Sequence, residues 1–233
     1  MGRAKEIIVK VIPAKIANEF VKKTHYSGKV VPNSKLHFGC FLDDKLHGVM
    51  SYGSSMDKSK TVGMVKDTKW NEFIELNRMA FDEFLPKNSE SRCIAISIRL
   101  LKKNAPHIKW IISFADGTQC GDGTIYRASG FLLTSIKKNT TIYEFPDGKR
   151  IALLTLTNGG DLSSRRKIAN KYGAEFTSKA SMKPFIDIGA KKASGYMLRY
   201  IYLIDKTCEL NVPVLPYSAI KESGASMYKG IKR

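Results

Sequence analysis

The run Trp-Ile-Ile-Ser-Phe-Ala at residues 110–115 is short, continuously apolar and ends abruptly at Asp116 and Gly117. A run of this kind predicts a strand that is buried on both faces, as in a sheet with helices on both sides. Open α/β sheets bind ligands beyond the carboxyl ends of their strands. We therefore expect Asp116 to lie at the edge of a ligand site.

Helical and strand-like patterns alternate on both sides of this run. Apolar spacing predicts helices that begin at Pro13 and Ser89, with Ser89 as a capping residue, and short helices at 124–129 and 165–173. Strands are predicted at 6–12, 36–42, 46–52, 73–81, 131–136, 141–145 and 199–205. This order predicts an α/β protein with a mixed sheet, interrupted by a basic insertion before the closing strand.

The composition excludes several classes of protein. The 233 residues are 43% hydrophobic and 26% charged, which is ordinary for a globular chain and excludes collagen-like or wholly disordered architectures. No apolar run approaches the roughly 18 residues of a membrane helix, and the start lacks the apolar segment of a cleaved signal. The four cysteines have no CxxC spacing, so we expect reduced thiols in a cytoplasm. No strongly amphipathic basic helix stands out, so we expect no membrane partner.

The net charge points to a polyanionic partner. The chain has 39 Lys and Arg against 21 Asp and Glu, a formal charge of +18. Such an excess attracts nucleic acids. The stretch 163–199 is especially basic, and we expect Arg165, Arg166, Lys167 and Lys171 to contact DNA phosphates. The alternative is a solvated charged face.

Three segments carry side chains suited to chemistry. A partly desolvated Asp116 could act as a base, or it could simply form the turn before Gly117. Tyr126 follows a glycine-rich helix start, and could face a ligand or pack against the sheet. His25 follows a helix, where it could serve as an acid, a base or a metal ligand, or interact with the helix dipole alone. No His pair has metal-site spacing, so any metal site would be assembled from distant segments.

A further candidate lies at the start of the helix predicted from Ser89. Backbone N–H groups there, together with Ser91 and Arg92, could bind a phosphate. A capped surface helix without a ligand is the alternative.

Five blocks of sequence occur together in a recognisable order. They are residues 25–28 (HYSG), 75–78 (ELNR), 86–92 (PKNSESR), 114–116 (FAD) and 123–131 (GTIYRASGF). Their order and spacing, from about residue 6 to residue 135, resemble the phage Mom family of DNA-modification proteins, which is related to the GNAT acyltransferase superfamily. The last block and the interval from Asp116 to Tyr126 are its most specific parts.

The resemblance implies a GNAT-like fold and an enzyme that adds a carbamoylmethyl group to the exocyclic N6 of adenine, protecting phage DNA from restriction. It implies duplex DNA with a flipped adenine and a small-molecule donor as partners, iron as a cofactor, and the cytoplasm of an infected bacterium as the location. The residues carried over by motif are His25, Tyr26, Asp116 and Tyr126 for catalysis. His25, Tyr26 and Asp116 would also ligate the metal, and Ser91 and Arg92 would hold the pyrophosphate of a donor.

One departure from the superfamily bears on the donor. Residues 88–95 lack the R/Q-x-x-G-x-G/A turn of acyl-CoA enzymes, which argues against coenzyme A and leaves the donor open. We predict a GNAT-like core over 1–157, a basic insertion over 158–195 that could contact DNA, and a closing strand with a tail over 196–233. Two other functions stay open, a conventional GNAT N-acetyltransferase acting on a small amine or protein and a non-catalytic DNA-binding protein.

Overall fold

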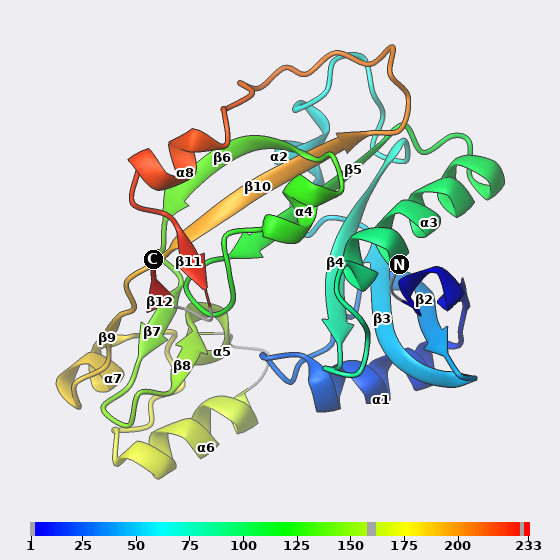
Figure 1. Cartoon of the computed structure of the whole chain (residues 1–233). Helices are drawn as coiled ribbons and strands as arrows, with labels where there is room; N and C mark the ends of the chain where they lie inside the picture. Colours follow the sequence, from blue (N-terminus) through cyan, green and yellow to red (C-terminus); the bar gives the residue numbers. More distant parts are fainter. Residues whose placement is uncertain (1–2, 158–161, 229–230) are drawn as a thin grey trace.

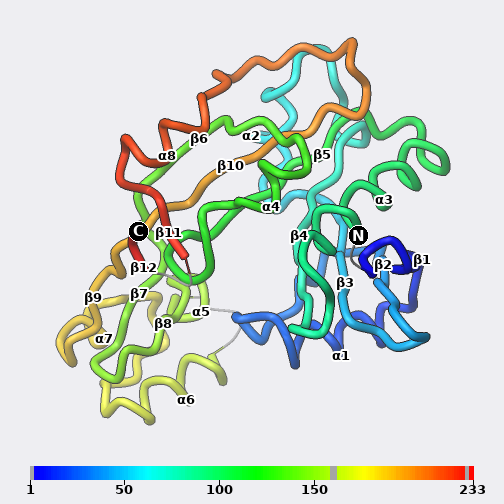
Figure 2. The backbone as a smooth tube through the Cα atoms, viewed as in Figure 1, coloured from blue at the N-terminus to red at the C-terminus, as the bar shows by residue number. Residues whose placement is uncertain are grey.

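A seven-stranded mixed sheet forms the centre of the protein in the computed structural model, which describes residues 3–157, 162–228 and 231–233 (Figures 1 and 2). Its strands are β1 (Ile8–Val11), β2 (Ser34–Leu42), β3 (Lys45–Gly53), β4 (Phe73–Phe81), β5 (Trp110–Asp116), β6 (Leu132–Lys138) and β10 (Tyr196–Leu203). The spatial order is β1-β2-β3-β4-β5-β10-β6. All neighbours are antiparallel except the parallel pair β4–β5. The predicted α/β class with a mixed sheet is confirmed.

Helices cover both faces of this sheet. Successive residues of a strand point to opposite faces, so the neighbours Val49 and Met50 of β3 (Lys45–Gly53) enter different cores. Val49 packs with Val21 of α1 (Ala14–Thr24). Met50 belongs instead to the larger core that contains Ile94 of α3 (Ser89–Asn104). The short helix α4 (Thr124–Ala128) lies beside α3, and its Tyr126 belongs to that same larger core.

The amino end of α3 differs from the prediction. Asn88, and not Ser89, is the capping residue, and it has a left-handed φ of 69°. Ser89 is the first helical residue, and its hydroxyl donates to the carbonyl of Pro86. The expected Ser89 cap is therefore wrong, because the hydroxyl is used within the preceding turn.

The sheet opens between β4 and β5. The two strands pair only over Phe73–Glu75 and Trp110–Ile112. The Ser113 hydroxyl donates to the Leu76 carbonyl at 3.1 Å, and the two strands then diverge (Figure 1). Trp110 is fully buried as predicted, but Phe114 is 39% exposed because its strand has by then lost this neighbour.

A second, smaller packed unit is formed by the part of the chain that connects β6 to β10. It consists of β7 (Ile142–Glu144), β8 (Arg150–Ala152), β9 (Lys191–Lys192), α5 (Leu153–Thr157), α6 (Leu162–Tyr172) and α7 (Lys183–Asp187). Its strands form their own sheet, β8-β7-β9, over a separate core that includes Phe145, Leu156 and Phe185. This unit begins with β7, before the residue 158 that charge alone suggested.

The remaining elements are short. They are a 3-10 helix (η1, Arg3–Glu6), α2 (Lys58–Val62), α8 (Ser218–Glu222), β11 (Met227–Tyr228) and β12 (Ile231–Lys232). The last two strands pair as an antiparallel hairpin. Within the described ranges, no helix has both the length and the apolar character needed to cross a membrane.

Candidate active site

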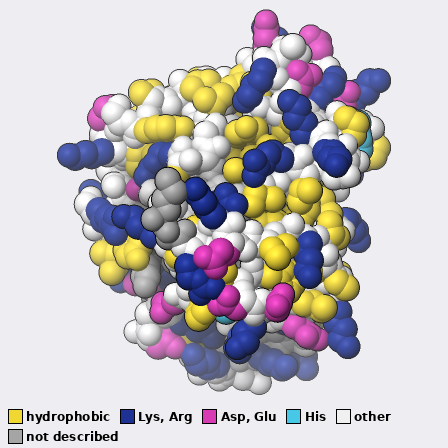
Figure 3. All heavy atoms as spheres, turned by 45° about the vertical axis from the view of Figure 1, so that its right-hand side comes forward, with side chains coloured by type: hydrophobic (Ala, Val, Ile, Leu, Met, Phe, Trp, Pro, Cys, Tyr) yellow, Lys and Arg dark blue, Asp and Glu magenta, His cyan; other side chains and the backbone are white. Residues whose placement is uncertain are grey.

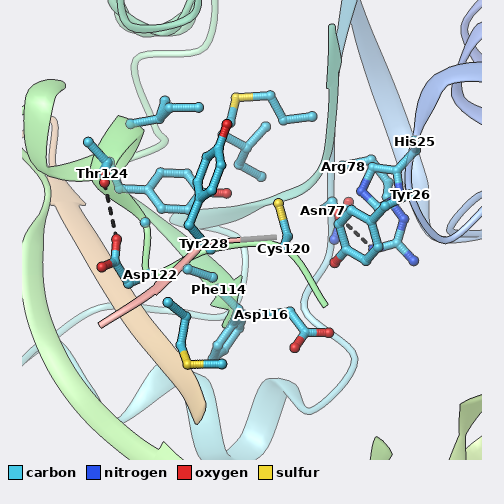
Figure 4. A pocket seen from close by; sticks show the side chains of 18 of the residues that line it. His25, Tyr26, Asn77, Arg78, Phe114, Asp116, Cys120, Asp122, Thr124 and Tyr228 are labelled. Carbon is cyan, nitrogen blue, oxygen red and sulfur yellow. Dashed lines mark hydrogen bonds between the residues drawn. The ribbon is translucent and has the colours of Figure 1, made fainter. Parts of the chain in front are cut away.

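A cavity of about 450 Å³ lies where β4 and β5 diverge. Its walls come from the segment after α1, the second half of β4, the end of β5 with the loop into α4, and the β11–β12 hairpin. Figure 4 shows side chains from these segments converging on one space. Cavities of roughly 300–1,000 Å³ are the size that holds small ligands in proteins.

The four residues predicted for catalysis all line this cavity. His25 caps the carboxyl end of α1, where its backbone N–H donates to the Val21 carbonyl at 2.9 Å, and Tyr26 follows it. Asp116 is the last residue of β5, and Tyr126 lies in α4. Divergence of the strands thus brings together three segments that are remote in sequence.

His25 is neutral and holds its proton at Nε2. The backbone N–H of Ser27 donates to His25 Nδ1 at 3.1 Å, so Nδ1 is an acceptor, and Ser27 Oγ lies 2.8 Å from the same nitrogen. Burial, together with the positive charge of Arg78, lowers the pKa of His25 to about 4. At neutral pH this ring therefore offers a hydrogen-bond donor at Nε2.

Tyr26 and Tyr126 keep their phenolic protons at neutral pH. Desolvation, followed by the charge of Asp116, raises the pKa of Tyr26 far above its ordinary value, although half of the residue's surface is exposed. The ring of Tyr26 also lies 4.2 Å from that of His25, centroid to centroid. Tyr126 is only 8% exposed, and burial raises its pKa to about 12. The two phenols therefore act as hydrogen-bond donors.

Asp116 supplies the anionic group of the cavity. Its Oδ1 accepts from the Thr118 backbone N–H at 3.0 Å, and its Oδ2 accepts from Gln119 Nε2 at 2.8 Å. Asp116 therefore forms the turn before Gly117, which was one of the two predicted roles, and it also lines the cavity. The other acid of the wall, Asp122, pairs with Arg127 at 3.1 Å. Asp116 has no such cationic partner in the part of the chain that the structure describes.

Sequence reasoning missed other residues of the cavity wall. Arg78 lies within a quoted block but was given no role. Its Nε donates to the Lys29 carbonyl at 3.1 Å and its Nη1 to the Asn77 carbonyl at 3.0 Å. Cys120, Tyr228 and Arg233 also line the cavity. No sequence pattern marked these three, because tertiary packing brings them to the wall.

The arrangement of these side chains does not fit a metal ion. Across residues 3–157, 162–228 and 231–233, no three His, Cys, Asp or Glu side chains gather closely enough to hold one. A metal on His25 Nε2 would need the proton at Nδ1, which already accepts the Ser27 N–H. Tyr26 would need to lose a proton that its surroundings retain. Iron remains an expectation that rests on the resemblance alone.

Ser91 and Arg92 lie in a separate surface depression of about 640 Å³ at the start of α3. Arg92 Nη2 donates to the Lys5 carbonyl at 3.0 Å, while its buried Nε has no hydrogen-bond partner among the described residues. Asn88 provides the left-handed turn that glycine usually supplies.

The structure corrects the predicted set of DNA-binding cations. Arg165 is only 1% exposed and donates to the Ser181 carbonyl at 3.0 Å, so it is part of the core of the insertion. Lys171 is exposed but its charge is paired with Asp147 at 2.8 Å. Arg166 and Lys167 are exposed on α6. These two remain candidates for phosphate contact.

The insertion is attached beside the cavity. The Arg150 guanidinium of β8 donates to the Thr118 carbonyl, in the loop that follows Asp116. Lys29, close after His25, donates from Nζ to the Thr155 hydroxyl of α5 at 2.8 Å. The segments that contain Lys29 and Thr118 each continue from residues that line the cavity, so the insertion lies beside the cavity. Lys and Arg side chains spread widely over the face seen in Figure 3.

Comparisons with known proteins agree with the predicted resemblance. The family model described as the Mom protein family matches residues 6–219. The methylcarbamoylase mom of Escherichia phage Mu is 34% identical over 161 residues, which are 67% of this chain and 66% of that protein. The chain thus matches slightly less than two thirds of the length of that relative.

Solved acetyltransferases are similar at a lower level. A GNAT family acetyltransferase from Elizabethkingia anophelis is 11% identical with a TM-score of 0.43, covering 84% of this chain and 97% of that one. The ribosomal-protein-S18-alanine N-acetyltransferase of Escherichia coli is 9% identical with a TM-score of 0.44, covering 85% and 94%.

Proposed function

The chain belongs to the Mom protein family, and we propose that it is a transferase that adds a carbamoylmethyl group to the exocyclic N6 of adenine in DNA. The modification would protect phage DNA from restriction in the cytoplasm of an infected bacterium. The observation that supports this best is the convergence of His25, Tyr26, Asp116 and Tyr126 on one cavity.

DNA binding begins with charge. The excess of +18 draws the protein toward the duplex, and lysines and arginines that displace counterions make this binding depend on salt. Arg166 and Lys167 are exposed on the insertion that flanks the cavity, and in this proposal they contact DNA phosphates. The target adenine must leave the base stack, at a cost of a few kcal/mol.

The chemistry needs a base near N6. The amine is a weak nucleophile because its lone pair is delocalised into the ring. In the proposed step N6 forms a bond to the donor carbon and loses a proton to Asp116, while the leaving group departs from the donor. His25 Nε2 and the Tyr126 hydroxyl donate hydrogen bonds that orient the two reactants. General base catalysis of this kind contributes typically 10²–10⁴-fold.

We propose that an anionic part of the donor binds at Ser91 and Arg92. The buried Arg92 Nε is a donor that such an anion could satisfy. Backbone N–H groups at the amino end of α3, which follows Asn88, could also bind a phosphate. The donor itself stays open, and the sequence of residues 88–95 argues against coenzyme A.

The function is tested by expressing the protein in bacteria and digesting their DNA to nucleosides for mass spectrometry. A deoxyadenosine carrying the mass of a carbamoylmethyl group, absent with an empty vector, supports the proposal. Unmodified DNA would count against it. If acetyl-CoA then raises the melting temperature while DNA does not, a conventional N-acetyltransferase is indicated. If DNA binds without any altered nucleoside, a non-catalytic binding protein is indicated.

A further inference from the structure

The β11–β12 hairpin forms one wall of the cavity, and it lies outside the stretch 6–219 that the family model matches. Tyr228 pairs with Gly121 through an isolated β-bridge, and the Asp122 backbone N–H donates to the Met227 carbonyl at 3.3 Å. Met227 is 5% exposed. The hairpin is therefore anchored to the loop that leads from β5 to α4.

Tyr228 and Arg233 form a pair at this wall. The Arg233 guanidinium lies 4.1 Å from the centroid of the Tyr228 ring, within the range of a cation–π contact. Tyr228 is 51% exposed, and both side chains line the cavity. Figure 4 places Tyr228 on the opposite side of the cavity from His25 and Tyr26.

The other aromatic rings of the cavity are less suited to receive a base. Tyr126 is 8% exposed and packs against Phe131 and Tyr200, with centroids 5.4 and 5.3 Å away. Tyr26 is as exposed as Tyr228, at 50%, but its ring already lies against that of His25. Phe114 also lines the cavity and is less exposed, at 39%. The Tyr228 ring combines exposure with an adjacent cation that no acidic residue of the described chain pairs with.

We propose that Tyr228 and Arg233 form the platform that receives the extruded nucleotide. The Tyr228 ring stacks on the adenine, and the Arg233 guanidinium contacts the adjoining phosphate of the DNA backbone. Stacking of a base on an aromatic side chain contributes about 1–3 kcal/mol, and guanidinium groups suit phosphate oxygens. This inference rests on the proposed DNA-modifying function and adds residues outside the family match to its binding site.

The test compares two labelled duplexes with the purified full chain. In one duplex a central adenine faces an abasic site, so that it can leave the stack easily, and in the other that adenine is itself replaced by an abasic site. The ratio of the two dissociation constants measures the recognition of the base. We expect Tyr228→Ala to lower this ratio by about tenfold, within the range for one stacked base, and Tyr228→Phe to preserve it.

Arg233 has a different expected signature. Arg233→Gln removes a phosphate contact and not a base contact, so it should weaken binding to both duplexes alike. The slope of log K against log salt should fall by about one. A change confined to the adenine duplex would overturn the phosphate role of Arg233.

Trp70→Ala is the matched control, because Trp70 is 63% exposed and carries Lys58 Nζ 4.6 Å from its ring, but lies at another depression. It should leave the ratio unchanged. If Tyr228→Ala keeps the wild-type ratio while its melting temperature is normal, the platform is wrong and the proposed function stands. If the wild-type protein itself shows no preference for the adenine duplex, the result contradicts the proposed function, and the platform with it.

Discussion

The backbone N–H of Ser27 donates to Nδ1 of His25 at 3.1 Å, which fixes the proton of the neutral imidazole at Nε2. His25 therefore enters the cavity chemistry as a hydrogen-bond donor. This separates it from Asp116, which has only acceptor oxygens when ionised. In the proposed reaction Asp116 of β5 acts as the base, whereas His25 after α1 and Tyr126 of α4 donate hydrogen bonds.

His25→Gln and His25→Ala distinguish a donor from a base. The glutamine amide can place an N–H near the position of the imidazole Nε2–H, whereas alanine cannot. We expect His25→Gln to keep DNA modification within about tenfold of wild type and His25→Ala to lose about 100-fold, the scale of one lost hydrogen-bond donor at the reacting atoms. The measurement is the fraction of modified adenine in DNA from expressing cells. Equal losses in both variants would indicate that His25 acts as a base.

Stability should depend on pH through the same residue. The pKa of His25 is about 4 in the folded protein and about 6.5 in an unfolded chain, so between these values the unfolded state binds more protons. The contribution of His25 to the free energy of unfolding is therefore present above pH 6.5 and is lost as the pH falls toward 4. Urea unfolding at pH 7 and pH 5 should show wild type losing more stability than His25→Gln. Parallel losses would contradict the cause assigned to the shift.

The basic insertion makes a prediction about salt. Arg166→Glu with Lys167→Glu should weaken DNA binding. The double variant should also lower the slope of log K against log salt concentration by about 1.8, because each phosphate contact contributes about 0.9. Lys171→Ala should change the slope less, since its charge is paired with Asp147. Filter binding at several salt concentrations measures both. An unchanged slope in the double variant would mean that α6 does not contact DNA.

Gly123→Ala tests the packing that holds α4 against the sheet. Gly123 has a φ of +81°, and an added Cβ would lie 2.4 Å from a ring carbon of the buried Tyr200. Gly173, with a φ of +68° and nothing within 4 Å of its Cβ position, is the matched control. Gly173→Ala should cost about 1 kcal/mol of unfolding free energy and Gly123→Ala about 1–3 kcal/mol more. Similar losses would contradict the close approach to Tyr200.

Local patterns predicted much of the central sheet, because its strands are apolar segments that are bounded by turn residues. The continuous run before Asp116 marked β5, and the alternating pattern marked the β2–β3 hairpin. Patterns could not show that β10 pairs with both β5 and β6, since pairing between residues about 60 to 90 positions apart leaves no local trace. The exposure of Phe114 likewise follows from the divergence of β4, which is a tertiary event.

The sequence predicted those residues of the candidate site that lie at or just after the end of a recognisable strand. Asp116 ends a buried strand and Tyr126 lies in the next helix, so both could be singled out from sequence. Charge counting misplaced Arg165, although its spacing from the buried Ala169 is that of one helix face. Tyr228 could not be found, because the hairpin reaches the cavity through contacts with residues more than 100 positions earlier.

The central claim, that this cavity modifies adenine, is tested most directly by one measurement on Asp116. Nucleosides from cells expressing wild type, Asp116→Ala or Trp70→Ala are compared by mass spectrometry, with DNA affinity and melting temperature determined for each protein. We predict modified deoxyadenosine with wild type and Trp70→Ala, and none with Asp116→Ala, whose DNA affinity stays within a few fold of wild type. Normal modification by a folded Asp116→Ala protein would contradict the account.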